Sequence, residues 1–89
     1  RIVLLPFPRQ GLYAIGLLMG DAPDSLQLAP DGRLSLIFVP TAPHPFTGYL
    51  ALVLTHELIP LRMGFHEAMK MEFSAGLYIP QPVQVSQQT

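Results

Sequence analysis

The stretch from residue 37 to residue 49, IFVPTAPHPFTGY, decides how the chain is organised. An apolar run ends in a loop that carries three prolines, and a second apolar run begins at a glycine: the loop residues are Pro40, Pro43, Pro45 and Gly48. Proline fixes φ at about −65° and biases the residue before it towards extended backbone. The stretch therefore predicts two strands joined by a stiff loop, and loops held by a scaffold often carry function.

Two further strands are predicted on the N-terminal side of this stretch. Residues 2–5 form a short apolar run that Pro6 and Pro8 interrupt, so the run is expected at a strand end or a sheet edge. A tight turn at residues 9–11 then leads into the apolar run 12–19, which makes the pair a β-hairpin. Gly16 inside the second run indicates a bulge or a close approach of the backbone.

The remaining strands follow from composition and turn residues. Residues 20–32 predict a surface loop with a short strand at 25–28, and residues 33–39 predict the strand that enters the proline loop. The run 48–54 is almost continuously apolar, which favours a strand buried on both faces. Residues 58–61 predict a short fifth strand limited by Pro60.

A helical period begins after Gly64. The apolar positions share one face of the predicted helix: Phe65, Ala68, Met69 and Phe73. The charged positions fall mostly on the opposite face: Glu67, Lys70 and Glu72. Gly64 is an acceptable N-cap, Gly76 is expected at C′ just after the helix, and residues 77–79 predict a last short strand.

These elements predict an α+β fold, with a mainly antiparallel sheet of four to six strands and one C-terminal helix packed on it. A barrel-like closure is one arrangement that such strands allow. Residues 1–80 are expected to form a single globular domain, and the polar, Gln-rich residues 81–89 to form a flexible tail.

The composition limits the classes of function. Apolar residues make up 49% of the 89 residues and charged residues only 12%, against roughly 25% charged in average proteins. Part of the surface is therefore expected to be apolar and covered by a membrane, a second copy or the rest of a parent protein. The alternative is a small domain that exposes more Leu and Met than usual. The chain lacks cysteine, a run of ~18 apolar residues and a basic stripe, so thiol chemistry is excluded and nucleic-acid binding is disfavoured.

Two kinds of chemistry are candidates. His44, His56 and His66, with Glu57 and Glu67, could supply metal ligands, but the HExxH spacing is absent and no metal or cofactor is predicted. A small hydrolase or metal-dependent enzyme would use Thr41 or Thr47 of the proline loop as nucleophile, His44 or His56 as base and Glu57 to orient the base. The Gly48 backbone would be the oxyanion donor. In the alternative interpretation, both threonines satisfy backbone groups of the loop.

Two other residues stand out as contact candidates. Arg9 in the hairpin turn could grip a phosphate or carboxylate of a sensed ligand, although such a residue is more often solvated. Met71 on the flank of the predicted helix is a candidate partner contact, whereas Met69 is expected in the core.

Several segments occur in an order that resembles a known family. They are residues 8–11, Ile15-Gly16, residues 38–48, residues 61–63 and residues 74–76 followed by Pro80. The series resembles the COV and LIKE-COV (continuous vascular ring) family of membrane proteins of unknown function. His44 departs from the amide residue expected at its position, and Ala75 stands where a second glycine is common.

The resemblance implies a parent protein with two transmembrane helices before this domain, which would lie on the cytoplasmic side. No catalytic activity or cofactor is established for that family, so the resemblance assigns no catalytic residues. Since the chain begins with Arg1, it is interpreted as a piece of such a protein.

The leading hypothesis is thus a non-catalytic, membrane-tethered interaction and oligomerisation module. Its partners would be copies of itself, the membrane-embedded part of the parent protein or the membrane surface. The candidate contact residues are Arg9, Pro40, Thr41, Pro43, His44, Pro45, Thr47, Gly48 and Met71.

Overall fold

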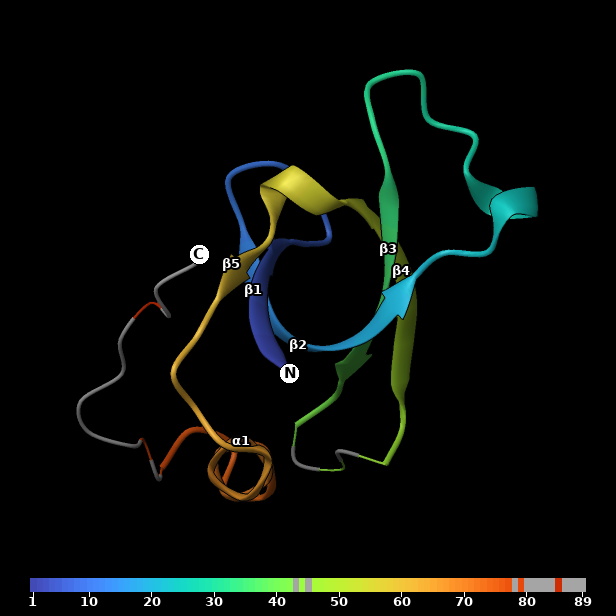
Figure 1. Ribbon diagram of the computed structural model, residues 1–89. Helices are drawn as coiled ribbons and strands as arrows, with labels where there is room; N and C mark the ends of the chain where they lie inside the picture. Colours follow the sequence, from blue (N-terminus) through green and yellow to red (C-terminus); the bar gives the residue numbers. More distant parts are fainter. Residues whose placement is uncertain (43, 45, 78, 80–84, 86–89) are drawn as a thin grey trace.

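A computed structural model describes residues 1–42, 44, 46–77, 79 and 85. They form an α+β fold, in which a five-stranded antiparallel sheet carries one helix near the C-terminus (Figure 1). The elements are β1 (Ile2–Pro6), β2 (Tyr13–Asp21), η1 (Asp24–Leu26), β3 (Leu34–Pro40), β4 (Gly48–Leu54), η2 (Thr55–Glu57), β5 (Ile59–Pro60) and α1 (Phe65–Phe73). The predicted fold class is confirmed.

The sheet has the order β4-β3-β2-β1-β5 and is strongly curved (Figure 1). It does not close into a barrel, because β4 and β5 remain its two edges among the described residues. The barrel-like arrangement is therefore wrong, and each edge must be accounted for separately.

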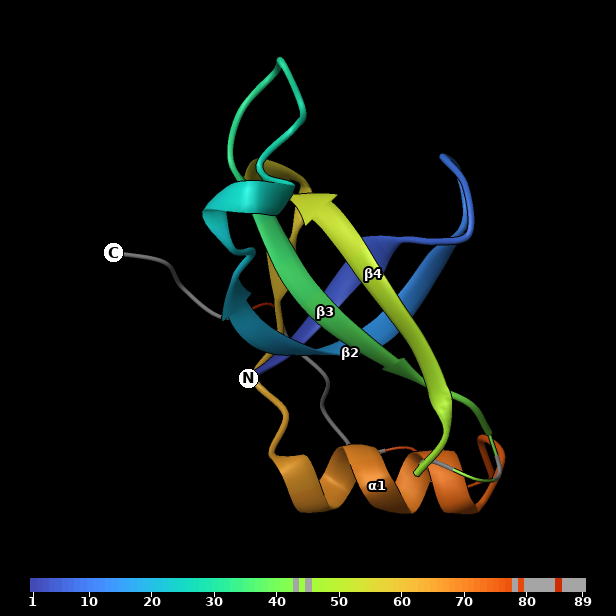
Figure 2. The ribbon, with the colours of Figure 1, turned by 90° about the vertical axis from the view of Figure 1, so that its right-hand side faces the viewer.

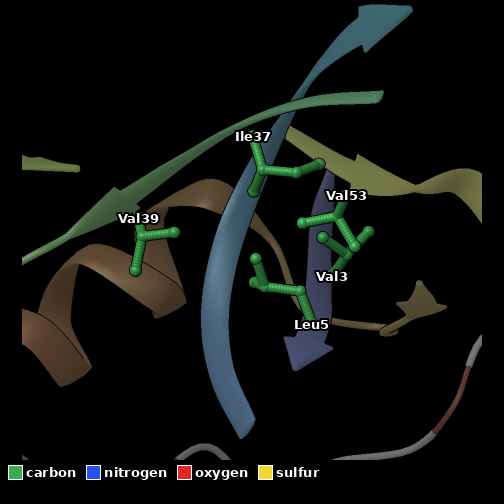
Figure 3. Packing of buried hydrophobic residues seen from close by; sticks show 5 residues of the cluster. All are labelled: Val3, Leu5, Ile37, Val39 and Val53. Atoms are coloured by element: carbon green, nitrogen blue, oxygen red, sulfur yellow. The ribbon is translucent and has the colours of Figure 1, made fainter. Parts of the chain in front are cut away.

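The concave face of the sheet holds the main core. Its buried side chains come from β1, β3 and β4 and converge in the interior (Figure 3): Val3, Leu5, Ile37, Val39 and Val53. Gly16 of β2 makes this convergence possible. A Cβ added there would lie 2.5 Å from Ile37 Cγ2 and 2.9 Å from Leu5 Cδ2, which confirms the predicted close approach.

Helix α1 lies across the other face of the sheet (Figure 2), where a second apolar cluster forms. Its buried members are Ile2, Leu61, Met63 and Ala68. The predicted helix face is partly wrong, because Phe65 and Phe73 are each 53% exposed. The helix instead turns Ala68 and Met71 towards the cluster, and Glu72 is half-buried rather than solvated. Packing over the curved sheet determines this rotation, which the periodicity alone does not specify.

The loop between β2 and β3 projects away from α1 (Figure 2) and contains no strand among its residues. The predicted strand at 25–28 is wrong, since the 3₁₀-helix η1 occupies this place. Gln27 anchors the loop: its Nε2 donates to the carbonyl oxygens of Ala22 and Leu34, each at 2.9 Å, and its Oε1 accepts from Leu34 N at 2.7 Å. A side chain that bonds the backbone three times holds these residues in a turn.

Strand β4 is an edge strand, so the prediction that both its faces are buried is wrong. Val53 is its one buried residue, while Tyr49, Leu50 and Leu52 are exposed. An uninterrupted apolar run is typical of a buried strand, but it occurs here at the margin of the sheet.

Two predictions near the C-terminus fall partly outside the described residues. Leu77 and Ile79 lie in no strand, whereas Tyr78 of the predicted strand is not described. The predicted flexible tail 81–89 also lies outside them, except Val85, which forms an isolated antiparallel bridge with Leu61. Within the described residues, no helix has the length and apolar character needed to cross a membrane.

The end of α1 forms a Schellman motif. Gly76 N donates to Met71 O at 2.9 Å, and Ala75 N donates to Glu72 O at 3.1 Å. The C′ residue, with φ of 53°, is Ala75 rather than the expected Gly76, which follows it with φ of 90°. An alanine in the left-handed region costs roughly 1–2 kcal/mol.

We predict that Ala75→Gly stabilises the domain by about 0.5–1 kcal/mol, because relief of this strain exceeds the added entropy of the unfolded glycine. Urea unfolding of both proteins measures the change. Gly76→Ala serves as the control and should destabilise, since it places a Cβ at φ of 90°. Equal or lower stability of Ala75→Gly would contradict the strained C′ position.

Candidate functional site

The proline loop closes the hairpin of β3 and β4 through its two threonines. The Thr41 hydroxyl oxygen lies 3.0 Å from His44 O, 3.1 Å from Thr47 O and 2.9 Å from the Thr47 hydroxyl oxygen. The Thr47 hydroxyl also lies 3.1 Å from His44 O. Both hydroxyls are thus used to hold the loop backbone, as the structural interpretation of these threonines predicted.

Gly48 is required where the loop enters β4. A Cβ at this position would collide with the carbonyl oxygen of Val39 across the hairpin and lie 2.9 Å from Pro40 Cα. The glycine therefore allows the two strands to approach at the base of the loop, which explains its place in the sequence without assigning it chemistry.

The residues of the hydrolase hypothesis are not brought together. Thr41, His44 and Thr47 precede β4, whereas His56 and Glu57 lie in η2 directly after it. A strand of this length separates its ends by about 20 Å, far beyond hydrogen-bond reach. The three histidines are exposed, and no group of three or more His, Cys, Asp or Glu within the described residues could hold a metal ion.

The other predicted contact residues are scattered. Arg9 is exposed in the turn between β1 and β2, while Pro43 and Pro45 lie outside the described residues. Met71 packs partly buried against the cluster beneath α1. Among the described members of the predicted set, only Pro40 lines the pocket that the structure forms nearby.

This pocket has a volume of about 230 Å³ and lies between α1, the outer face of the sheet and the proline loop. The sheet supplies aliphatic and aromatic walls: Ile2, Ile15, Leu17, Phe38 and Pro40. The loop supplies Phe46, whose ring centroid lies 5.6 Å from that of Phe73 at the end of α1. The helix supplies the remaining side chains: Phe65, Ala68, Met69 and Glu72.

Glu72 is the one charged residue among the described residues that line the pocket. Burial raises the pKa of its carboxyl above the ordinary value, because the charged form loses water there. The residue also lies in the last turn of α1, where the helix dipole disfavours a negative charge. Sequence periodicity had assigned Glu72 to the solvated face, so this site was missed.

We predict that Glu72→Gln stabilises the domain at neutral pH, by no more than about 0.5 kcal/mol because solvent screens a partly exposed group. The native carboxyl has a raised pKa, so its ionisation destabilises the fold as pH rises through the native pKa. Below the unfolded-state pKa of about 4.3 both states are protonated, and the gain should vanish. Thermal melts from pH 3 to pH 8 measure this.

Glu57→Gln is the matched control, since it removes one negative charge outside the pocket. The burial of Glu72 would be contradicted if Glu72→Gln and Glu57→Gln had the same pH-dependent effect on the melting temperature.

The second feature is the open edge of β4. Two hydrogen bonds bracket its ladder with β3, from Thr41 N to Thr47 O and from Thr55 N to Arg33 O. Bonded and non-bonded pairs alternate along an antiparallel ladder, so the odd-numbered residues of β4 bond to β3. The even-numbered residues direct their backbone groups to the side where no described strand pairs: Gly48, Leu50, Leu52 and Leu54.

An apolar row leads from beneath α1 to this edge. Across the outer face, Ile2 pairs with Leu17, Leu17 with Phe38, and Phe38 with Leu50. Exposure rises along the row, from 4% at Ile2 to 70% at Leu50. The row ends uncovered at the margin of the sheet, next to the free backbone groups of β4.

Comparison with known proteins gave one family. A family model described as "Protein of unknown function (DUF502)" matches residues 1–47, which is more than half of the chain and includes β1 to β3 and most of the proline loop. No curated protein and no solved structure matched the chain.

Proposed function

The chain belongs to the DUF502 family of proteins of unknown function, and we propose that it acts as a non-catalytic interaction module that pairs with a second copy of itself through the edge of β4. The observation that supports this most directly is the apolar, unpaired edge, with Leu50 exposed at 70%.

The two edges of the sheet differ in how they are protected. Edge strands commonly avoid association by being short, or by carrying proline or charge. Strand β5 has only two residues, one of which is Pro60. Strand β4 has seven residues, GYLALVL, with neither proline nor charge, so it is the edge that can accept another strand.

A second copy fits this edge because antiparallel pairing of two β4 strands obeys two-fold symmetry. Each copy would present the same backbone groups and the same side chains to the other, which closes the contact after two subunits. Leu50 and Leu52 would meet their counterparts near the axis. The low net charge of −1 gives little repulsion between copies.

The proposal also includes tethering to a membrane in a longer parent protein, with this domain on the cytoplasmic side. The resemblance to the COV and LIKE-COV family supports it, together with the low fraction of charged residues. A tether in the membrane plane would raise the local concentration of copies, so a weak edge contact would suffice for pairing.

We predict that Leu50→Lys shifts the domain towards monomer and weakens self-association at least tenfold, because a two-fold interface contains the substitution twice. Sedimentation velocity over a range of concentrations measures this. Leu28→Lys is the matched control: Leu28 is 78% exposed but lies in the loop between β2 and β3, so its substitution should leave association unchanged.

Two outcomes would count against pairing through β4. One is a native domain that stays monomeric at all concentrations, and the other is equal weakening by both substitutions. The tether is tested separately by fractionating cells that express the parent protein: recovery in the soluble fraction would contradict it, whatever the association of the isolated domain.

A further inference from the structure

We propose that the pocket between α1, the outer sheet face and the proline loop binds a small organic ammonium group with an apolar shell, such as a trimethylammonium. This site goes beyond the proposed pairing through β4, since it uses other side chains and does not require a second copy.

Charge selects the sign of the ligand. The lining is apolar except for Glu72, the sole charged residue that the described part of the chain contributes to the wall. The carboxylate of Glu72 favours a cation in the pocket and opposes a carboxylate or phosphate. A neutral apolar ligand would bury the carboxylate further without a partner, which is unfavourable.

The walls select the kind of cation. Three phenylalanines from three elements line the pocket: Phe38 of β3, Phe46 of the proline loop and Phe65 of α1. Aromatic faces attract cations, and an ammonium covered with methyl groups loses less hydration than a bare one when it enters such walls. Sites that combine aromatic rings with a carboxylate are suited to binding methylated ammonium groups.

The size of the pocket limits the ligand to a small group. Its volume of about 230 Å³ lies below the roughly 300–1,000 Å³ of sites for drug-sized molecules. Phe46 is 82% exposed and packs edge-on against Phe73 at a centroid distance of 5.6 Å. The ring therefore stands at the rim, where it can cover a bound group without being part of the core.

The experiment titrates the 89-residue chain with choline and with 3,3-dimethyl-1-butanol, its neutral isostere, and follows the methyl NMR signals of Met69, Ile15 and Ile2. We expect choline to shift these signals saturably and to bind at least tenfold more tightly than the isostere. Glu72→Gln should weaken choline binding at least tenfold without weakening binding of the isostere, which no longer buries an unpaired carboxylate.

Two further variants keep the result interpretable. Glu57→Gln removes a carboxylate outside the pocket and should bind choline as the native chain does. Phe46→Ala, at an exposed position, should retain the fold and lower choline affinity severalfold. Absence of binding by the native chain, equal binding of the isostere, or an unaltered affinity in Glu72→Gln would each overturn the proposal. A finding that the domain is monomeric would not contradict this binding site, because the pocket lies within one copy.

Discussion

The register between β3 and β4 is the constraint on which the rest of the structure depends. With Ile37 opposite Ala51 and Phe38 opposite Leu50, β3 sends alternate side chains to opposite faces. Its inward residues build the core, and Phe38 and Pro40 on the outer face build the pocket wall. A shift by one residue would exchange the two sets. The threonine contacts of the proline loop and the close approach at Gly48 hold this register at one end.

The uncovered part of the outer face of the sheet explains where the many apolar residues of this weakly charged chain lie. Helix α1 covers the row of paired residues at Ile2 but not at Leu50. Phe46 and Leu77, exposed at 82% and 93%, extend the apolar surface near the end of the helix. A chain with only 12% charged residues does not distribute charge over all of this surface. The features left open are an edge that can pair and a pocket with one carboxylate.

Much of the fold could be predicted because proline and glycine mark the ends of strands and the turns between them. The bounds of β4 match the predicted run, the hairpins follow the predicted turns, and Gly16 marks a close approach. What could not be predicted depends on neighbours in space. A continuous apolar run does not distinguish an edge strand from a central one. The helical periodicity predicted a buried face of α1 that is rotated from the observed one, so Glu72 was placed on the solvated face. Ala75 took the C′ position because the helix ended one residue earlier than Gly76 indicated.

Some features of the candidate site could likewise be predicted from the sequence, and others could not. The proline loop was predicted to contact a partner, and this role stays a prediction; Pro40 and Phe46 line the pocket. Its threonines serve the loop itself, and the distant His56 and Glu57 take no part. The pocket needed side chains from β1, β2, β3, the loop and α1, and no local pattern in the sequence links these segments. Glu72 could have been noticed only as a carboxylate in the last turn, where the dipole opposes it.

Amide hydrogen exchange at several protein concentrations tests most directly whether β4 is a free edge at which two copies meet. We expect the amides of Leu50 and Leu52 to exchange rapidly in dilute protein and to become protected as the concentration rises. The amides of Tyr49 and Val53, which bond to β3, should be protected throughout. Protection of Leu50 and Leu52 that is already present in dilute protein, or that never develops, would contradict the claim.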